Sequence, residues 1–246
     1  MIFCELTESE FSKFEEKSPF GNVMQTVERA KFREKMGFQS FLLGVKDEDK
    51  VSAAGLAVEK NGEVWVQIGP ILDWENVKLI RVFLKGILKF CRDKKFSELE
   101  IFPPILLSVR NTQGEKTEIF DQRKVFAVFQ ECGFKHLGFT TGTEFKALRW
   151  MFVKDLSGFK DMREAELSFS ASTRKKLHQT ERALDVVTLS DKSELGDWIK
   201  PLQESNARNG IKTRDLKYFE DIWDTFGDKA MFIEAKRKET GEIVAS

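Results

Sequence analysis

The residues whose types and spacing are best suited to hold a ligand lie between positions 208 and 219. Gly210 is expected to end one helix, and Arg214 lies where the next helix should begin. The first turn of a helix combines unpaired backbone N–H groups with the positive end of the helix dipole, so it favours an anion such as a diphosphate. Tyr218, one turn after Arg214, can direct its hydroxyl group to the same side, and Lys212 adds a second positive charge. The alternative is a solvated surface, as for most Arg and Lys residues.

Several common catalytic motifs are absent. The sequence has no G-x-x-x-x-G-K-[ST] loop, no G-x-G-x-x-G after a strand and no G-x-S-x-G. His136 and His178 are isolated, and three widely spaced cysteines, without a C-x-x-C pair, support neither a zinc site nor a disulfide framework. We therefore predict no metal and no cofactor.

Charge and hydropathy indicate where the protein is located in the cell and which kinds of partner it can bind. Forty Lys and Arg balance forty Asp and Glu, which gives a formal net charge of +0. The chain therefore has no overall positive field that would attract it to nucleic acid or to an anionic membrane, and binding of a polyanion would need a local patch of positive charge. The first residues do not resemble a signal peptide, and no apolar run approaches the roughly 20 residues of a membrane helix. We expect a cytoplasmic protein without an integral membrane segment.

The hydrophobic pattern predicts an α/β (α+β) chain of two units, residues 1–147 and 148–246. In the first unit, two helices (7–17 and 22–36) precede a three-strand antiparallel meander (40–44, 51–58 and 63–68). A helix (75–93), a strand (97–102), a helix (117–132) and a strand (134–139) follow. Asn22 and Gln25 have the spacing of a capping box at the second helix. In the second unit we predict a strand at 149–153, a basic helix at 172–182, a strand at 184–189, helices at 194–209 and 216–226, and a hairpin of 230–235 with 242–246.

This order of elements, with Cys132-Gly133-Phe134 between the last helix and strand, resembles an acetyltransferase-like (GNAT-like) unit. Residues 41–46 and 50–53 resemble 231–236 and 242–245, which indicates a second, incomplete GNAT-like unit, although two apolar hairpins also look alike by chance. Because a domain ending in mid-strand would leave an unpaired edge, we expect the chain to be the front part of a longer protein. The Q/R-x-x-G-x-G/A loop that binds coenzyme A pyrophosphate in ordinary acetyltransferases is not found.

Several motifs, in order along most of the chain, resemble the FemABX family. S-P-F-G-N-V-M-Q at 18–25 with R-A-K-F-R at 29–33 is similar to the family's S-P-x-G-x-x-x-Q…W-A-x-x-K helix, and G-P-I-L-D at 69–73 to its G-P-x-x-D turn. I-F-P at 101–103 is similar to the family's strand that ends at proline, and residues 170–182 are similar to its basic helix before a short strand. R-N-G-I-K-T-R at 208–214, with Tyr218-Phe219, is similar to the family's R-x-G-I-x-x-R-x-x-x-Y-F segment.

The resemblance implies an aminoacyltransferase that moves an amino acid from aminoacyl-tRNA to the stem peptide of a peptidoglycan precursor, in cell wall biogenesis and the maintenance of cell shape. By position in the motifs, Arg33, Arg214 and Tyr218, with Lys212 beside them, would bind the precursor, either UDP-MurNAc-peptide or a lipid-linked form. Arg174, Lys175 and Lys176 of the basic helix are candidates for binding tRNA phosphates, although an exposed amphipathic helix has the same composition.

Three departures from the family pattern concern the precursor more than the reaction class. Arg33 stands where the family has lysine, Arg29 where it has tryptophan, and Phe102 where some members have aspartate. The resemblance also implies a catalytic lysine beyond Ser246, so no catalytic residue is assigned. Two alternatives stay open: a coenzyme A-dependent N-acyltransferase, and a non-catalytic module that binds the precursor. The donated amino acid, an inserted coiled-coil arm and the oligomeric state are not specified by the sequence.

Overall fold

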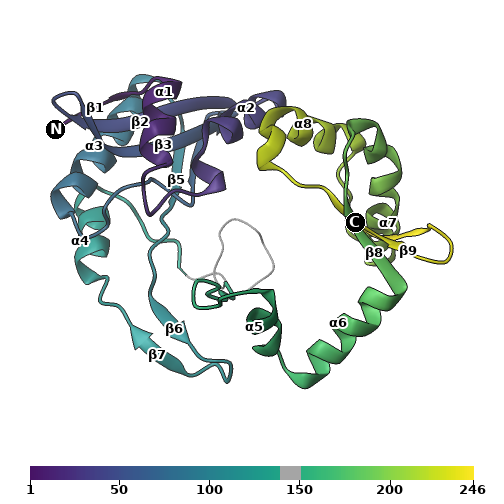
Figure 1. Cartoon of the computed structure of the whole chain (residues 1–246). Coiled ribbons are helices and arrows are strands. Elements are labelled where there is room, and N and C mark those ends of the chain that lie inside the picture. Colours follow the sequence, from purple (N-terminus) through teal and green to yellow (C-terminus); the bar gives the residue numbers. More distant parts are fainter. Residues whose placement is uncertain (139–150) are drawn as a thin grey trace. The chain divides into compact units, whose positions relative to one another are not determined.

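The computed structural model describes residues 1–138 and 151–246 (Figure 1). The chain divides into two units, Met1–Arg149 and Trp150–Ser246, and each is described by itself. Both contain helices and strands, so the predicted mixed α/β class is confirmed. The assignment of each unit as GNAT-like stays a prediction.

The first unit is built on a five-stranded sheet in the order β1-β2-β3-β4-β5. Neighbouring strands are antiparallel except β4 and β5, which are parallel. The predicted meander is thus confirmed and extended by an N-terminal strand that the pattern did not indicate. The strands are β1 (Ile2–Glu5), β2 (Gln39–Asp47), β3 (Lys50–Lys60), β4 (Glu63–Gln67) and β5 (Glu98–Phe102).

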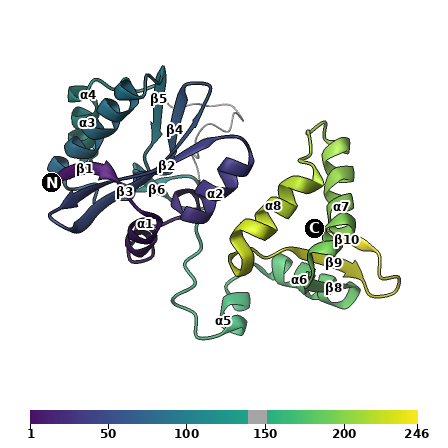
Figure 2. The same cartoon turned by 90° about the horizontal axis from the view of Figure 1, so that it is seen from above.

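Helices cover both faces of this sheet (Figure 2). They are α1 (Glu8–Glu15) and α2 (Val27–Lys35) on one face, with the short 3-10 helix η1 (Val23–Gln25) before α2, and α3 (Val77–Asp93) and α4 (Arg123–Glu131) on the other. Strand residues alternate between the two cores: Leu43 and Val64 face α3, whereas Leu56 and Val58 pack with α1 and α2. The apolar stripe predicted for residues 75–93 therefore forms the larger core.

The start of α2 differs from the prediction. Asn22 caps η1, because its side chain accepts a hydrogen bond from the Met24 N–H, while Thr26 caps α2 by accepting one from the Arg29 N–H. The Gln25 side chain does not turn back to Asn22 and instead enters the sheet. The predicted Asn22–Gln25 capping box is wrong, because the strands offer the Gln25 amide buried backbone partners.

Residues 103–138 also depart from the prediction. A hairpin of β6 (Ser108–Arg110) and β7 (Lys116–Ile119) occupies the start of the helix expected at 117–132, so α4 begins only at Arg123. The turn of this hairpin places Gly114 at φ 83°, a conformation that glycine tolerates. The strand expected at 134–139 is not formed by residues 134–138, and residue 139 lies outside the described ranges.

The second unit contains a three-stranded antiparallel sheet in the order β10-β9-β8. Its core is made by Leu189, Leu195, Trp198, Ile199 and Phe232. The three helices predicted at 172–182, 194–209 and 216–226 are confirmed within a residue or two. The elements are α5 (Met162–Leu167), α6 (Ala171–Ala183), β8 (Leu184–Thr188), η2 (Lys192–Glu194), α7 (Leu195–Arg208), α8 (Leu216–Phe226), η3 (Gly227–Lys229), β9 (Ile233–Arg237) and β10 (Ile243–Ala245).

Two further differences concern the beginning of this unit. Residues 151–153 of the strand expected at 149–153 are not in a strand, and 149–150 lie outside the described ranges. The helix α5 was not expected, since its six residues are too few for a periodic pattern.

Candidate functional site

Arg33 lies in the last turn of α2 and is half-buried. Its guanidinium carbon lies 3.7 Å from the centre of the Phe38 ring, and Lys60 Nζ lies 4.7 Å from the same ring centre. Phe38 also makes an edge contact with Trp65 on β4, so its ring is held by the sheet. Two positive charges therefore share one fixed aromatic ring at the end of β3. Lys60 was not predicted as a site residue, because its only signal in the sequence is its place before the Asn61-Gly62 turn.

The two motifs at 18–25 and 69–73, which resemble those of the FemABX family, meet around Gln25, which is fully buried. Gln25 Nε2 donates to the Gln67 carbonyl (2.7 Å), and Gln25 Oε1 accepts from the Leu56 N–H (2.7 Å). Asn22 Nδ2 donates to the Ile68 carbonyl (3.0 Å). A Cβ added to Gly69 would lie 2.5 Å from the Gln25 side chain, so only glycine fits there. These motif residues join β3 to β4, which makes their role structural.

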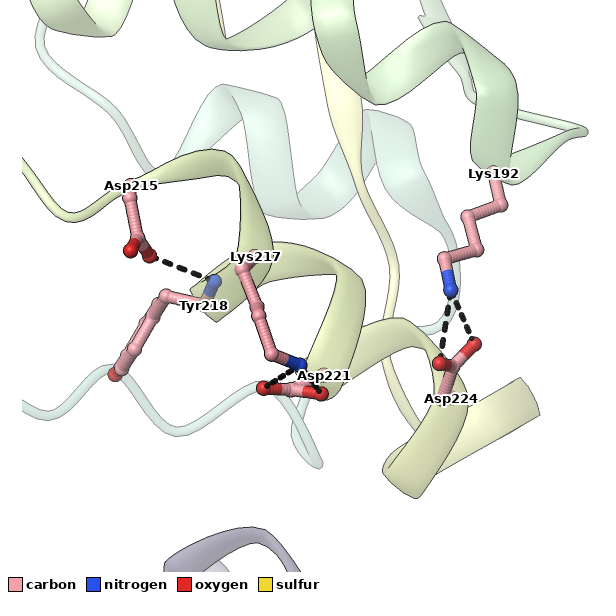
Figure 3. Close-up of polar contacts among 6 residues, drawn as sticks. All are labelled: Lys192, Asp215, Lys217, Tyr218, Asp221 and Asp224. Carbon is pink, nitrogen blue, oxygen red and sulfur yellow. Dashed lines mark hydrogen bonds and ion pairs between the residues drawn. The ribbon is translucent and has the colours of Figure 1, made fainter. Parts of the chain in front are cut away.

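The N-terminal end of α8 differs from the expected anion site. Asp215 caps the helix, and its carboxylate accepts from the Tyr218 N–H (3.0 Å), as Figure 3 shows. An acidic side chain thus already occupies the helix end. The Tyr218 N–H is paired with Asp215 and is not one of the free N–H groups that the predicted anion site needs. The Arg214 guanidinium carbon lies 5.2 Å from the centre of the Tyr218 ring, so both predicted residues lie together. Lys212 and Arg214 are exposed.

One ion pair lies within α8 and a second joins α8 to η2 (Figure 3). Lys217 Nζ is 3.0 Å from both carboxylate oxygens of the buried Asp221, one turn further along α8. Lys192 of η2 contacts both oxygens of Asp224 at 2.9 and 2.8 Å. The lysine–aspartate contact raises the pKa of Lys192 above its ordinary value. These charges are used within the fold, so we do not count them as ligand groups.

The predicted nucleic-acid helix is α6, and it has no buried residue. Arg174 donates from its guanidinium to the carbonyl groups of Leu167 and Phe169, near the end of α5. Arg174 therefore also holds α5 to α6. Lys175 and Lys176 are exposed on the same helix.

The sequence-predicted residues fall into two separate groups. Arg33 belongs to the first unit, whereas Lys212, Arg214, Tyr218 and the α6 residues belong to the second. That Arg33 and the Arg214–Tyr218 pair contact one ligand stays a prediction.

A cavity that the sequence does not predict lies within the first unit. Its volume is about 440 Å³, and it lies between α1, the segment that follows α1, the start of β3 and the turn after β4. The basic side chains in its lining are Lys13, Lys17 and Lys50.

Within residues 1–138 and 151–246, no group of three or more His, Cys, Asp or Glu side chains is arranged to hold a metal ion. Among the helices of the same ranges, none combines the length and hydropathy that a membrane span requires.

Comparison with known proteins identifies relatives along nearly the whole chain. The model of a family described as "FemAB family" matches residues 6–238. Aminoacyltransferase FemB of Staphylococcus epidermidis is 29% identical over 239 residues, which cover 94% of this chain and 57% of FemB. Aminoacyltransferase FemA of Staphylococcus aureus (strain bovine RF122 / ET3-1) is 27% identical over 163 residues, covering 63% of this chain and 39% of FemA. The chain thus spans little more than half the length of FemB.

Among solved structures, one described as the crystal structure of FemX has the same fold. The two structures superpose with a TM-score of 0.74 at 19% sequence identity, and the match covers 96% of this chain and 58% of that chain.

Proposed function

Because the chain belongs to the FemAB family, we propose that it is an aminoacyltransferase of cell wall synthesis. It transfers an amino acid from aminoacyl-tRNA to the stem peptide of a peptidoglycan precursor, in the cytoplasm. The observation that carries the proposal is the family match over residues 6–238, which includes every residue assigned to the precursor. The relatives FemB and FemA are themselves named aminoacyltransferases.

The precursor's phosphates are the part of the substrate that the exposed and half-buried cations suit best. Arg33, beside Lys60 and stacked on Phe38, supplies a planar guanidinium that can donate two parallel hydrogen bonds to phosphate oxygens. Arg214, stacked on Tyr218, supplies the same group from the second unit, and Lys212 adds a point charge. We assign UDP-MurNAc-peptide or its lipid-linked equivalent to these residues.

The reaction requires mainly that the enzyme orient the precursor amine toward the aminoacyl ester, because the ester is already activated. The precursor amine attacks the ester carbonyl, the tRNA hydroxyl leaves, and the amine loses a proton. A positively charged donor near the carbonyl stabilises the tetrahedral oxyanion. No enzyme nucleophile is needed, and the described residues are assigned to binding and positioning only.

The donor tRNA is assigned to α6. Because Arg174 already donates to backbone carbonyl groups, the exposed Lys175 and Lys176 are the better candidates for tRNA phosphates. Contacts of this kind involve only the backbone of the nucleic acid, so binding should weaken steeply as salt is raised.

A transfer assay with charged tRNA and UDP-MurNAc-peptide tests the proposal, and it uses the chain extended to the length of FemB, because the resemblance implies a catalytic lysine beyond Ser246. We expect the labelled amino acid to reach the peptide, and Arg214→Gln to weaken precursor binding about tenfold. Arg163→Gln, which removes an exposed charge from α5 outside the assigned residues, serves as the matched control and should change nothing. Precursor binding without transfer would identify a binding module, and release of thiol from acetyl-coenzyme A would identify the coenzyme A-dependent alternative; either result would overturn the assignment.

A further inference from the structure

The cavity in the first unit is a second candidate ligand site, distant from Arg33 and Lys60 of the same unit. Its lining runs from Lys13 in α1 to Asp73 after β4. The part of β3 that it includes is Lys50 to Ser52, whereas Lys60, beside Arg33, lies at the other end of that strand. Lys60 lies eight positions after Ser52, and at about 3.4 Å per position this corresponds to about 27 Å. A group bound in the cavity is therefore too distant to share the phosphate assigned to Arg33.

The floor of the cavity is apolar. Leu72 is 1% exposed, and Phe14 and Val51 are half-buried against the core that α1 and α2 share with the sheet. Phe20 lines the cavity with 40% of its surface exposed. An aromatic or aliphatic group placed there would remove both its own surface and that of Phe20 from water, at roughly 25 cal/mol per Å².

The rim of the cavity is positively charged. Lys13, Lys17 and Lys50 are exposed, and in the described part of the chain none of the three is ion-paired. Asp73 is the one acidic side chain in the lining. Three positive charges and one negative charge leave a net charge of +2, and the C-terminal end of α1 offsets roughly half a charge of that. A phosphate monoester, at about −1.5 to −2 near pH 7, balances this charge better than a single carboxylate does.

The segment that forms one wall is held in shape without a ligand. The Ser18 hydroxyl accepts from the Phe20 N–H (3.2 Å), and the Ser18 carbonyl accepts from the Gly21 N–H (3.1 Å). A Cβ at Gly21 would lie 2.6 Å from the Glu15 carbonyl oxygen, so the close return of the chain at this point requires glycine. Phe20 is thus presented by an ordered turn, and binding there costs little conformational entropy.

We propose that this cavity binds a small organophosphate, with the phosphate among Lys13, Lys17 and Lys50 and the apolar part against Phe14, Phe20 and Leu72. The site goes beyond the proposed aminoacyl transfer and does not depend on it. It gives the chain a place to bind a phosphorylated metabolite independently of the precursor.

Calorimetric titration of the whole chain with phenyl phosphate tests the proposal. We expect binding that weakens as salt is raised, about threefold weaker binding for Lys17→Gln, and at least thirtyfold weaker binding for the Lys13→Gln/Lys17→Gln/Lys50→Gln variant. Phe20→Ala should also weaken binding, since it removes the apolar wall. Lys78→Gln, which removes an exposed lysine of α3, is the matched control and should bind like the unaltered chain.

Several results would overturn the site. Equal affinity for benzyl alcohol would show that the phosphate is not recognised, and equal weakening by Lys78→Gln would show a general charge effect. Binding only to vesicles containing phosphatidylglycerol, and not to phenyl phosphate, would assign the surface to a membrane instead. The single variants keep the test valid if the triple variant unfolds. Titration of the triple variant with UDP-MurNAc-peptide separates this site from the proposed function, because that affinity should be unchanged.

Discussion

Gln25 shows how one polar residue organises a sheet. β3 pairs with β4 from Val58 to Lys60, and nearer the start of β3 the Leu56 N–H has the Gln25 side chain as its partner instead. Beyond this point Ala54 pairs with Ile71, on the chain that has returned after β4. The side-chain amide therefore replaces one rung of the ladder, where an unpaired backbone group would be costly.

We expect Gln25→Leu to lower the free energy of unfolding of the first unit by about 2–4 kcal/mol. Leucine fills a similar volume but leaves the buried Leu56 N–H and Gln67 carbonyl without their partner. Urea unfolding monitored by circular dichroism measures the change. Gln130→Ala, at an exposed position on α4, should change stability by less than about 0.5 kcal/mol. A similarly small effect of Gln25→Leu would show that the bridge is not needed.

Glu10 should make the stability of the first unit depend on pH. Its contact with Lys46 (2.5 Å) and its capping-box bonds to Thr7 lower its pKa from 4.5 to about 2. Because the pKa is lower in the folded state, this carboxylate contributes stability above about pH 4.5, and the contribution is lost as the pH falls toward 2. The stability difference between the unaltered chain and Glu10→Gln should accordingly be constant near neutral pH and shrink below pH 4.5.

Thermal unfolding of both proteins between pH 7 and pH 2.5 checks this. Lys46→Met provides the control, because it removes the largest cause of the lowered pKa and should move the pH dependence upward. A difference that stays the same across the series would contradict the assignment.

At the scale of elements, periodic segments were predictable and short ones were not. Residues 77–93 bury Ile80, Leu84, Ile87 and Cys91 on one stripe, and this spacing was visible in the sequence. β6 and β7 have three and four residues, and β7 is exposed along its whole length, so no burial pattern marked them. The hydrogen-bond partners of Gln25 could not be predicted from the sequence either, because they are backbone groups that only the fold brings together. In the candidate site, residue types were predictable from the motifs, whereas the Asp215 cap and the lysine-lined cavity depend on local geometry.

The packing of α3 on β1 depends on a glycine. A Cβ at Gly86 would lie 2.1 Å from the Phe3 ring, so the helix approaches the strand as closely as its backbone allows. We expect Gly86→Ala to lower the free energy of unfolding by about 1–3 kcal/mol, although alanine is the better helix former by about 1 kcal/mol.

Denaturant unfolding of Gly86→Ala, Phe3→Ala and the double variant tests this contact. The double variant should be less destabilised than the sum of the single changes, because Phe3→Ala removes the clash. Gly196→Ala in α7 is the control, since a Cβ there meets nothing within 4 Å. Strict additivity of the two changes would show that the close approach does not decide the packing.

At the scale of the whole molecule, the two units share an order of elements. The first begins with strand β1, two helices and the hairpin β2–β3, and the second contains strand β8, helices α7 and α8, and the hairpin β9–β10. In both, the three strands are antiparallel neighbours in chain order. Each unit also has its own apolar core. The internal repeat expected from the likeness of residues 41–46 and 50–53 to 231–236 and 242–245 stays a prediction, and this common order agrees with it.

The proposed function requires both units to hold one precursor, and a double-mutant cycle tests that requirement. Arg33→Gln and Arg214→Gln should each weaken binding of UDP-MurNAc-peptide about tenfold, or about 1.4 kcal/mol. If both guanidinium groups contact the same diphosphate, the double variant should bind between tenfold and 100-fold more weakly than the unaltered chain, with a coupling energy of about 0.5–1.4 kcal/mol. Calorimetric titration measures the four affinities, and the cycle of Arg33→Gln with Arg163→Gln should show no coupling. Strictly additive effects of Arg33→Gln and Arg214→Gln would mean that the two arginines bind separate groups, because residues that share a ligand atom cannot be removed independently.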